Sequence, residues 1–315
     1  MLYILNREHW LAELKDTRAL LLNEQQEVVD SLSKVYNCEP AYFVFKRKDK
    51  VIISFIAFTK GKKLFQPIHF FYSAFWVDSE LSDRIYAASL SEFIEELKKR
   101  YKHIHIALPV EIKDIRPFLW QGFSVENRYT YLKQTNELSY GKYMERKLVK
   151  AEQLPLKFIE EKINAAAIDL NLKLLKQLNF SKASLNDIKE LLGSLGNTKY
   201  LVSFNVYLNE ELLISDILLK DEDNNLIYEV LKNSLKGDSN IHSVSYHRLF
   251  QYYGKEGFKI VDLMGADMQS ISKFKAGFNP ILAPHFIVKY NWHKNMIRES
   301  KAKLKTIIKR LLRGT

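Results

Sequence analysis

The stretch NSLKGDSNIHSVSYHRLFQYYGKEGFKIVDLMGADMQSISKFKAGFN, residues 233–279, shows most clearly how the chain folds. Apolar residues recur at helical spacing over 241–255, and a short apolar run follows at 258–264. Gly265 ends that run, and a second helical pattern, ISKFKAGF, follows at 271–278. The stretch therefore predicts a strand between two helices.

The same pattern occurs in the first half of the chain, where residues 115–123 read IRPFLWQGF. In both halves a hairpin, a third strand, a helix and a further strand precede the motif, at an offset of about 155 residues. The sequence therefore predicts an α/β (α+β) protein of two tandem units, with mixed, mostly antiparallel sheets flanked by helices. The matching residues are Ile115, Phe118, Gly122 and Phe123 in the first copy and Ile271, Phe274, Gly277 and Phe278 in the second.

The boundary between the copies is expected near residue 140, because Gly141 and a charged run interrupt the pattern there. Helical spacing then predicts two helices, near 158–170 and 185–192, before the second hairpin. In each copy the third strand is expected from an apolar, aromatic or β-branched run. These third strands are predicted at 64–76 and 226–231, and the expected domains are 1–140 and 141–293.

A basic tail is expected at 294–315, where eight Lys and Arg residues face one acid, Glu299. The tail supplies +7 of the formal charge of +11, so the rest of the chain has an ordinary balance. If the tail is helical, its apolar residues form one stripe, which is typical of an interfacial helix on an anionic membrane. Binding to RNA and packing on its own domain are the alternatives.

Cys38 is the single cysteine, so an intrachain disulfide or a thiolate metal cluster is excluded and a reducing compartment is indicated. No apolar run reaches the roughly 20 residues that span a bilayer. The N-terminus MLYILNREHW becomes polar too soon for a signal peptide. We therefore expect a cytoplasmic protein, with peripheral contact to the inner face of the membrane through residues 294–315 as a further expectation.

The element order resembles that of the tandem GNAT-fold acyltransferases of the FemABX-like branch. The motifs that carry the resemblance are FQP at 65–67, IRPFLWQGFSVENRYTYL at 115–132 and the stretch at 233–279. The resemblance implies an acyl- or aminoacyltransferase that acts on an amine of a cell-wall precursor or envelope sugar, with acyl-CoA or aminoacyl-tRNA as donor. Coenzyme A usually needs a glycine-rich loop before a helix, and KNSLKGDSNIHS at 232–243 offers only Gly237. An aminoacyl-tRNA donor does not require that loop.

Three residues are candidates for catalysis. Lys275 is expected to face the developing oxyanion, Asp262 to orient the amine or Lys275, and His247 to carry a proton. The alternatives are a solvated surface lysine, a turn carboxylate and a helix histidine with a structural partner. Asp267 is expected to be the N-cap of the following helix.

Binding residues are expected in both copies. A metal site is not expected, because His242 and His247 lack helical i, i+4 spacing and His103 and His105 lack acidic or thiolate neighbours in the sequence. The competing function is that of a ligand-binding protein without catalysis, and the competing role for the aromatic residues is core packing. The donor-binding candidates are Asn233, Gly265, Ser270 and Phe274, and the acceptor-binding candidates are Gln66, His69, Tyr72, Arg116 and Arg128.

Overall fold

The structure is a computed structural model that describes residues 1–67, 69–235, 237–293 and 295. The chain forms two compact units, and neither is continuous in sequence. The predicted basic tail lies, apart from Asn295, outside the described residues. Unit 1 contains the described residues of Met1–Arg18 and Cys38–Asn127 and those from His285 on, and unit 2 contains the described residues of Ala19–Asn37 and Arg128–Pro284.

Unit 1 is built on a sheet with the strand order β1-β2-β3-β4-β6-β13, and β5 pairs with β3. Its neighbouring strands are antiparallel except for the parallel pair β4 and β6. Its elements are β1 (Leu2–Leu5), α1 (Arg7–Leu14), β2 (Glu39–Arg47), β3 (Lys50–Lys60), β4 (Lys63–Phe65), β5 (Ala74–Val77), α3 (Asp83–Arg100), β6 (His103–Leu108), α4 (Arg116–Trp120) and the part of β13 (Ile281–Asn291) from His285 on.

The core of unit 1 lies between this sheet and α3. The apolar stripe of α3, which includes Phe93 and Leu97, packs against Phe55 of β3 and Ile104 of β6. Phe118, from the first copy of the repeated motif, is fully buried in the same core. The aromatic residues of the motif are therefore core residues in unit 1.

The strand predicted at 64–76 is wrong in its middle part. β4 ends at Phe65 and β5 begins at Ala74, and the described residues between them, 66, 67 and 69–73, form an irregular segment. Pro67 lacks a backbone N–H, and His69 has a φ of +73°, so this segment does not continue a regular strand.

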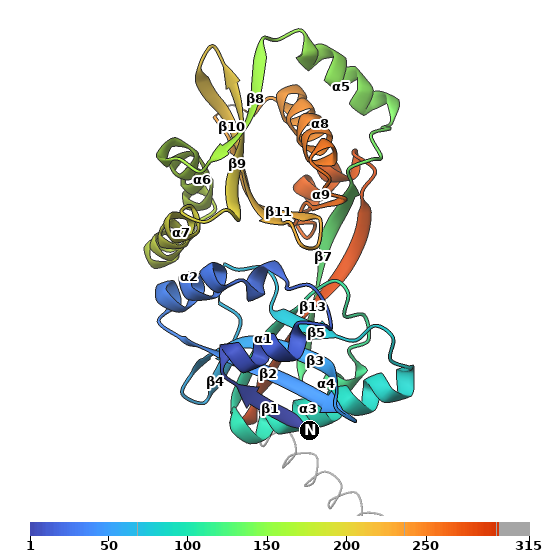
Figure 1. Cartoon of the computed structure of the whole chain (residues 1–315). Helices are drawn as coiled ribbons and strands as arrows, with labels where there is room; N and C mark the ends of the chain where they lie inside the picture. Colours follow the sequence, from blue (N-terminus) through green and yellow to red (C-terminus); the bar gives the residue numbers. More distant parts are fainter. Residues whose placement is uncertain (68, 236, 294, 296–315) are drawn as a thin grey trace, which may run out of the picture. The chain divides into compact units, whose positions relative to one another are not determined.

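Unit 2 is built on a sheet with the order β7-β12-β11-β10-β9-β8. Figure 1 shows α6 and α7 on one side of this sheet and α5, α8 and α9 on the other. The strands are the part of β7 (Ser124–Gln134) from Arg128 on, β8 (Leu156–Lys162), β9 (Leu201–Leu208), β10 (Glu211–Asp221), β11 (Leu226–Ser234) and β12 (Ile260–Asp262). The helices are η1 (Leu22–Glu24), α2 (Gln26–Tyr36), α5 (Lys142–Glu152), α6 (Ala165–Gln177), α7 (Lys182–Leu195), α8 (Ser239–Lys255) and α9 (Gln269–Ala276).

The helix predicted at 158–170 is wrong in its first part. Phe158 and Ile159 belong to β8, which pairs with β9. The helix begins only after Asn164, whose side chain caps it by accepting a hydrogen bond from the Ala167 N–H at 2.9 Å. The helix predicted at 185–192 is confirmed as the longer α7.

Each repeat gives its last strand to the other unit. β7 follows α4 of the first repeat and pairs with β12 in unit 2, whereas β13 follows α9 of the second repeat and pairs with β6 in unit 1. Helix α2 also lies in unit 2, where it packs against α7. For this reason the compact units differ from a single division of the chain at residue 140.

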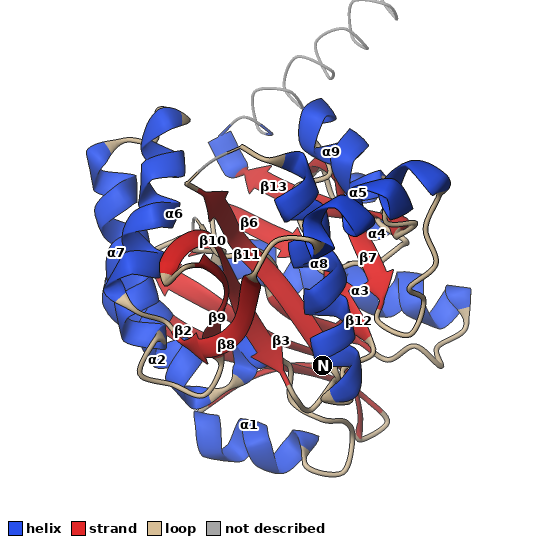
Figure 2. Ribbon diagram, turned by 90° about the horizontal axis from the view of Figure 1, so that it is seen from above, coloured by secondary structure: helices blue, strands red, loops and turns tan. Residues whose placement is uncertain are grey.

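The predicted fold class is confirmed. Figure 2 shows sheets flanked by helices, and within each unit the described strand pairs are mostly antiparallel, with β4–β6 in unit 1 and β11–β12 in unit 2 parallel. In each pair a helix lies between the two parallel strands in the sequence: α3 lies between β4 and β6, and α8 lies between β11 and β12. Across the part of the chain that the structure describes, no helix is both long enough and apolar enough to cross a bilayer.

Candidate functional site

The two parallel strands of unit 2 separate after three residues. Leu226–Tyr228 of β11 pair with Ile260–Asp262 of β12, and β12 ends there. β11 continues to Ser234, and among the described residues its positions after Tyr228 pair with β10 alone, with a bulge at Val230. The carboxyl ends of β11 and β12 therefore leave one side of β11 without a strand partner, and such ends are where α/β folds place ligands.

Lys275 of α9 bridges the two strands at the point where they separate. Its ammonium group donates to Oε2 of Glu229 in β11 at 2.7 Å, to the carbonyl oxygen of Leu263, and to that of Met264 at 3.2 Å. Lys275 and Glu229 are only 7% and 3% exposed. Three acceptors engage the three ammonium protons, so Lys275 is not a solvated surface lysine.

A second buried ion pair lies beside the first. Lys232 of β11 donates to Oδ2 of Asp216 in β10 at 2.7 Å and to Oγ of Ser245 in α8 at 3.1 Å. Its ammonium group also lies 3.6 Å from the ring centroid of Tyr246, which is a close cation–π contact. We call Asp216, Glu229, Lys232 and Lys275 the charge cluster.

The two carboxyl groups of the charge cluster share their surroundings, but their pKa values shift in opposite directions. Burial raises the pKa of Asp216 to about 7, although Lys232 opposes this shift. Burial alone would also raise the pKa of Glu229, but Lys275 and Lys232 together lower it. The Tyr246 hydroxyl donates a further hydrogen bond to Glu229, and burial raises the pKa of Tyr246 well above 10.

Asp216 and Glu229 each have one buried carboxyl oxygen atom without a donor among the described residues. These atoms are Oδ1 of Asp216 and Oε1 of Glu229. The Asp216 carboxyl lies within hydrogen-bonding range of Glu229. A protonated Asp216 can donate a hydrogen bond to an ionised Glu229, whereas two ionised carboxylates cannot hydrogen-bond to one another.

Three of the predicted site residues surround Lys275. Asp262 is 1% exposed and accepts hydrogen bonds from the Thr130 hydroxyl and from the Met264 N–H at 3.0 Å. These bonds hold the turn whose carbonyl oxygens, those of Leu263 and Met264, accept from Lys275. Gly265 has a φ of +59°, a region that favours glycine, and completes that turn. Phe274 packs on Tyr246, with ring centroids 5.9 Å apart.

The structure places three other predicted residues away from the charge cluster. Nδ2 of Asn233 donates to the carbonyl oxygen of Leu170 in α6 at 2.6 Å, and Ser270 is exposed in the first turn of α9. Nδ1 of His247 lies 3.2 Å from the Tyr140 hydroxyl, and no described hydrogen bond joins it to the charge cluster. Burial, and then the charge of Arg248, lower the pKa of His247.

The N-terminus of α8 is closed by its own cap. The Asp238 carboxylate accepts hydrogen bonds from the backbone N–H groups of Asn240 at 2.7 Å and Ile241 at 3.4 Å. These are the groups that a helix N-terminus would offer to a pyrophosphate, and a carboxylate there also repels an anion. The sequence expectation that Asp267 caps α9 is wrong, because Met268 is the N-cap and Asp267 instead accepts from the Tyr129 N–H at 3.1 Å.

Three of the predicted acceptor-binding residues lie in the irregular segment between β4 and β5 of unit 1. Gln66 is buried and donates through Nε2 to the carbonyl oxygen of Tyr72 at 2.9 Å. Tyr72 is also buried and packs edge-on against His285, with ring centroids 5.1 Å apart. His69 is half-buried at the position of positive φ.

The two predicted arginines are exposed and paired. Arg116 forms a bidentate pair with Asp114, with Nε–Oδ1 and Nη2–Oδ2 distances of 2.9 and 2.8 Å. Arg128 belongs to unit 2, where its Nη1 lies 3.5 Å from Oδ2 of Asp267. Arg116 therefore belongs to unit 1 and Arg128 to unit 2.

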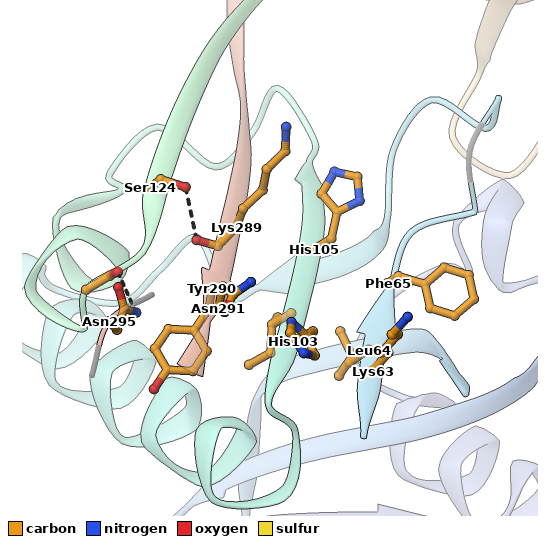
Figure 3. Close-up of a pocket in the computed structure, with 12 residues that line it drawn as sticks. Lys63, Leu64, Phe65, His103, His105, Ser124, Lys289, Tyr290, Asn291 and Asn295 are labelled. Carbon is orange, nitrogen blue, oxygen red and sulfur yellow. Dashed lines mark hydrogen bonds between the residues drawn. The ribbon is translucent and has the colours of Figure 1, made fainter. Parts of the chain in front are cut away.

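Unit 1 contains a cavity of about 730 Å³ on the face of its sheet that points away from α3. The cavity extends over β4, β6, β7 and β13, as Figure 3 shows. No predicted site residue is among its described lining residues, which are Lys63, Leu64, Phe65, His103, Ile104, His105, Gly122, Ser124, Lys289, Tyr290, Asn291 and Asn295.

Sequence reasoning missed most of the charge cluster. Asp216 interrupts the apolar run LLISDILL at 212–219, and Glu229 and Lys232 interrupt the strand that follows. A charged residue within a strand buried on both faces is itself a signal, because it needs a partner. Among the described residues, no group of three or more His, Cys, Asp or Glu side chains has the arrangement of a metal site.

Comparison with known proteins places the fold. No protein-family model and no curated protein sequence matches the chain. Solved structures that resemble it include FemX, with a TM-score of 0.62 and 11% identity over 95% of this chain and 99% of FemX. A tandem GNAT protein from the clavulanic acid biosynthesis pathway has a TM-score of 0.52 and 9% identity, over 91% of this chain and 97% of that one.

L-PGS from Bacillus licheniformis resembles the chain to a similar degree. Its TM-score is 0.51 at 12% identity, and the match covers 91% of this chain and 92% of L-PGS. All three matches extend over nearly the whole of both chains, so they include both repeats. The chain therefore has the fold of these structures, one of which is a tandem GNAT protein, and this confirms at the level of the fold the resemblance expected from the motifs.

Proposed function

We propose that the protein is a GNAT-type acyl- or aminoacyltransferase whose donor binds at the separated ends of β11 and β12. The observation that carries the proposal is the unpaired side of β11 after Tyr228, next to the buried ion pair of Lys275 and Glu229. Backbone groups on that side are free of a neighbouring strand within the described chain, so an extended donor can hydrogen-bond to them.

In this proposal the charge cluster positions the strand ends. Lys275 holds the carbonyl oxygens of Leu263 and Met264 toward Glu229, which fixes the opening between the strands. During transfer the amine nitrogen bonds to the acyl carbon, the acyl–oxygen or acyl–sulfur bond of the donor breaks, and the amine loses a proton. A hydrogen bond from Lys275 to the developing oxyanion would have to replace one of its three present acceptors.

Aminoacyl-tRNA is the donor that the structure favours. Asp238 already occupies the N-terminal amides of α8, so a coenzyme A pyrophosphate would have to displace a carboxylate from them. We propose an amine of a cell-wall precursor or envelope sugar as the acceptor, in line with the resemblance to FemABX-like proteins. Cytoplasmic action and peripheral contact through the basic tail belong to the same proposal.

A radiolabelled transfer assay tests this function. Aminoacyl-tRNAs and acyl-CoAs are incubated separately with the protein and a panel of amine acceptors that includes muropeptide precursors. Transfer should occur with an aminoacyl-tRNA and be lost in the double variant Lys275→Met/Glu229→Met, which removes both charges of the pair together. Lys189→Met, an exposed lysine of α7, is the matched control and should retain transfer.

A second candidate function is a ligand-binding protein that carries out no chemistry. The observation in its favour is that all three protons of Lys275 are engaged within the protein. Absence of transfer with every donor, together with thermal stabilisation by an acceptor alone, would establish this function in place of the transferase.

A further inference from the structure

The cavity in unit 1 lies on a sheet face that carries polar residues in two cross-strand rows. Phe65 of β4 pairs with His105 of β6, and His105 pairs with Lys289 of β13. The neighbouring row contains Lys63, His103 and Asn291. Alternate residues of the same strands, such as Ile104 and Val288, point to the opposite face and into the core beside α3.

Figure 3 shows the side chains of His105 and Lys289 projecting to the same side of the sheet, with Phe65 on the adjacent strand. At one end of the cavity, the amide of Asn295 donates to the carbonyl oxygen of Gly122 at 3.1 Å. Ser124 donates to the carbonyl oxygen of Lys289 at 3.2 Å, which fixes β13 beside β7. The cavity is therefore built on paired strands rather than on loops.

The charge of this cavity is positive. Its described lining contains two lysines and two histidines and no acidic residue. Lys289 is paired with Glu126 at the rim, at 2.7 Å, and Lys63 has no carboxylate partner among the described residues. Nε2 of His105 is buried and has no hydrogen-bond partner within the described chain. A ligand that brings an acceptor to Nε2 and negative charge to the lysines would satisfy these groups.

We propose that this cavity binds a small organic phosphate, with the phosphate between Lys63 and Lys289 and an apolar ring or chain against Phe65. A volume of about 730 Å³ suits a ligand of this size. Lysine is a common phosphate ligand as a point charge, and the neutral imidazole of His105 can donate to a phosphate oxygen through Nε2–H. Asn291 and Ser124 supply polar groups for the rest of the ligand. The site is in unit 1 and does not depend on the proposed transferase activity.

Isothermal titration calorimetry of the full chain tests the site with phenyl phosphate as the probe. Benzoate, which has the same ring and a carboxylate, and inorganic phosphate, which has no ring, are compared with it. We expect saturable binding of one phenyl phosphate per chain, at least tenfold weaker binding of benzoate, and weaker binding of inorganic phosphate. Equal affinity for benzoate would overturn the assignment to phosphate, and absence of saturable binding by all three probes would overturn the site.

Charge-matched variants locate the binding. Lys63→Gln and Lys289→Gln should each weaken phenyl phosphate binding at least fivefold, because each removes a charge beside the phosphate. Lys48→Gln removes the same charge from the exposed β2–β3 turn of the same unit and should leave binding unchanged. A melting temperature close to that of the unmodified protein confirms that each variant folds. Equal weakening by Lys48→Gln would show non-specific attraction and contradict the proposal.

Discussion

Lys275→Met should destabilise the protein strongly, because it leaves the Glu229 carboxylate buried without its nearest countercharge. At the observed 2.7 Å, two unit charges attract by about 6 kcal/mol in an effective dielectric of ~20. Lys232 compensates part of the charge of Glu229, and methionine retains the apolar stem. Removal of one partner from a buried pair typically costs about 3–5 kcal/mol, and we expect a loss in that range.

The double variant Lys275→Met/Glu229→Met distinguishes a charge effect from a packing effect. Removal of both charges should recover most of the loss, since a buried pair replaced by apolar residues is often neutral. Equilibrium urea denaturation followed by circular dichroism gives the free energy of unfolding of both variants. Lys189→Met, at an exposed position of α7, should change it by no more than about 0.5 kcal/mol.

The reasoning on the buried pair would be refuted by either of two results. A loss of less than about 1 kcal/mol in Lys275→Met would show that Lys275 is not committed to Glu229 in solution. A double variant as unstable as the sum of the single variants would show that the two residues do not interact.

Further predictions concern other buried groups of unit 2. Lys133 is fully buried, and burial lowers its pKa. Its Nζ has no hydrogen-bond partner among the described residues and lies 5.5 Å from the ring centroid of Tyr140. Lys133→Met should therefore raise the free energy of unfolding by about 1–3 kcal/mol in urea denaturation; a loss would show that the cation–π contact outweighs the cost of burying the charge. Between pH 3.8 and about 7, folded Asp216 retains a proton that the unfolded chain releases, so the free energy of unfolding should decrease as pH rises through this window. Asp216→Asn should show a smaller decrease when the free energy of unfolding is measured across the same window. An unchanged slope would contradict the raised pKa. Phe278→Ala should lower the free energy of unfolding by about 3–5 kcal/mol in the same assay, because the side chain is fully buried among the aromatic rings of α8. A decrease below about 1 kcal/mol would contradict its place in the core.

The sequence was most informative where a pattern repeats. The strand expected at 258–264 is present as the shorter β12, and the helix expected at 271–278 is present as α9, which ends at Ala276; both were predictable because apolar spacing changes there from strand to helix and glycine ends the run. The same spacing misled at Phe158 and Ile159, since a short apolar run fits a strand and a helix equally well until a capping residue such as Asn164 is recognised.

The exchange of last strands between the units could not be predicted from local pattern. β7 and β13 have the alternation of ordinary strands, and nothing in that alternation states which sheet they join. Only the pairing of β7 with β12 and of β13 with β6 reveals the exchange.

Part of the candidate site was predictable from residue type alone. Lys275 was expected near the end of a strand that carries Asp262 and Gly265, and the structure places these residues together. Its partner Glu229 was not expected, because residues 46 positions apart meet only through tertiary pairing. The same holds for Asp216 and Lys232, which join neighbouring strands.

Hydrogen exchange measured by mass spectrometry, with and without a donor, tests the central claim most directly. The account predicts that a non-hydrolysable aminoacyl-tRNA analogue slows exchange of the backbone amides of residues 229–234, which among the described residues have no partner strand on the β12 side. Segment 260–277, which contains Lys275, should be protected at the same time. Unchanged exchange in both segments at a donor concentration that saturates binding would contradict the placement of the donor at the separated ends of β11 and β12.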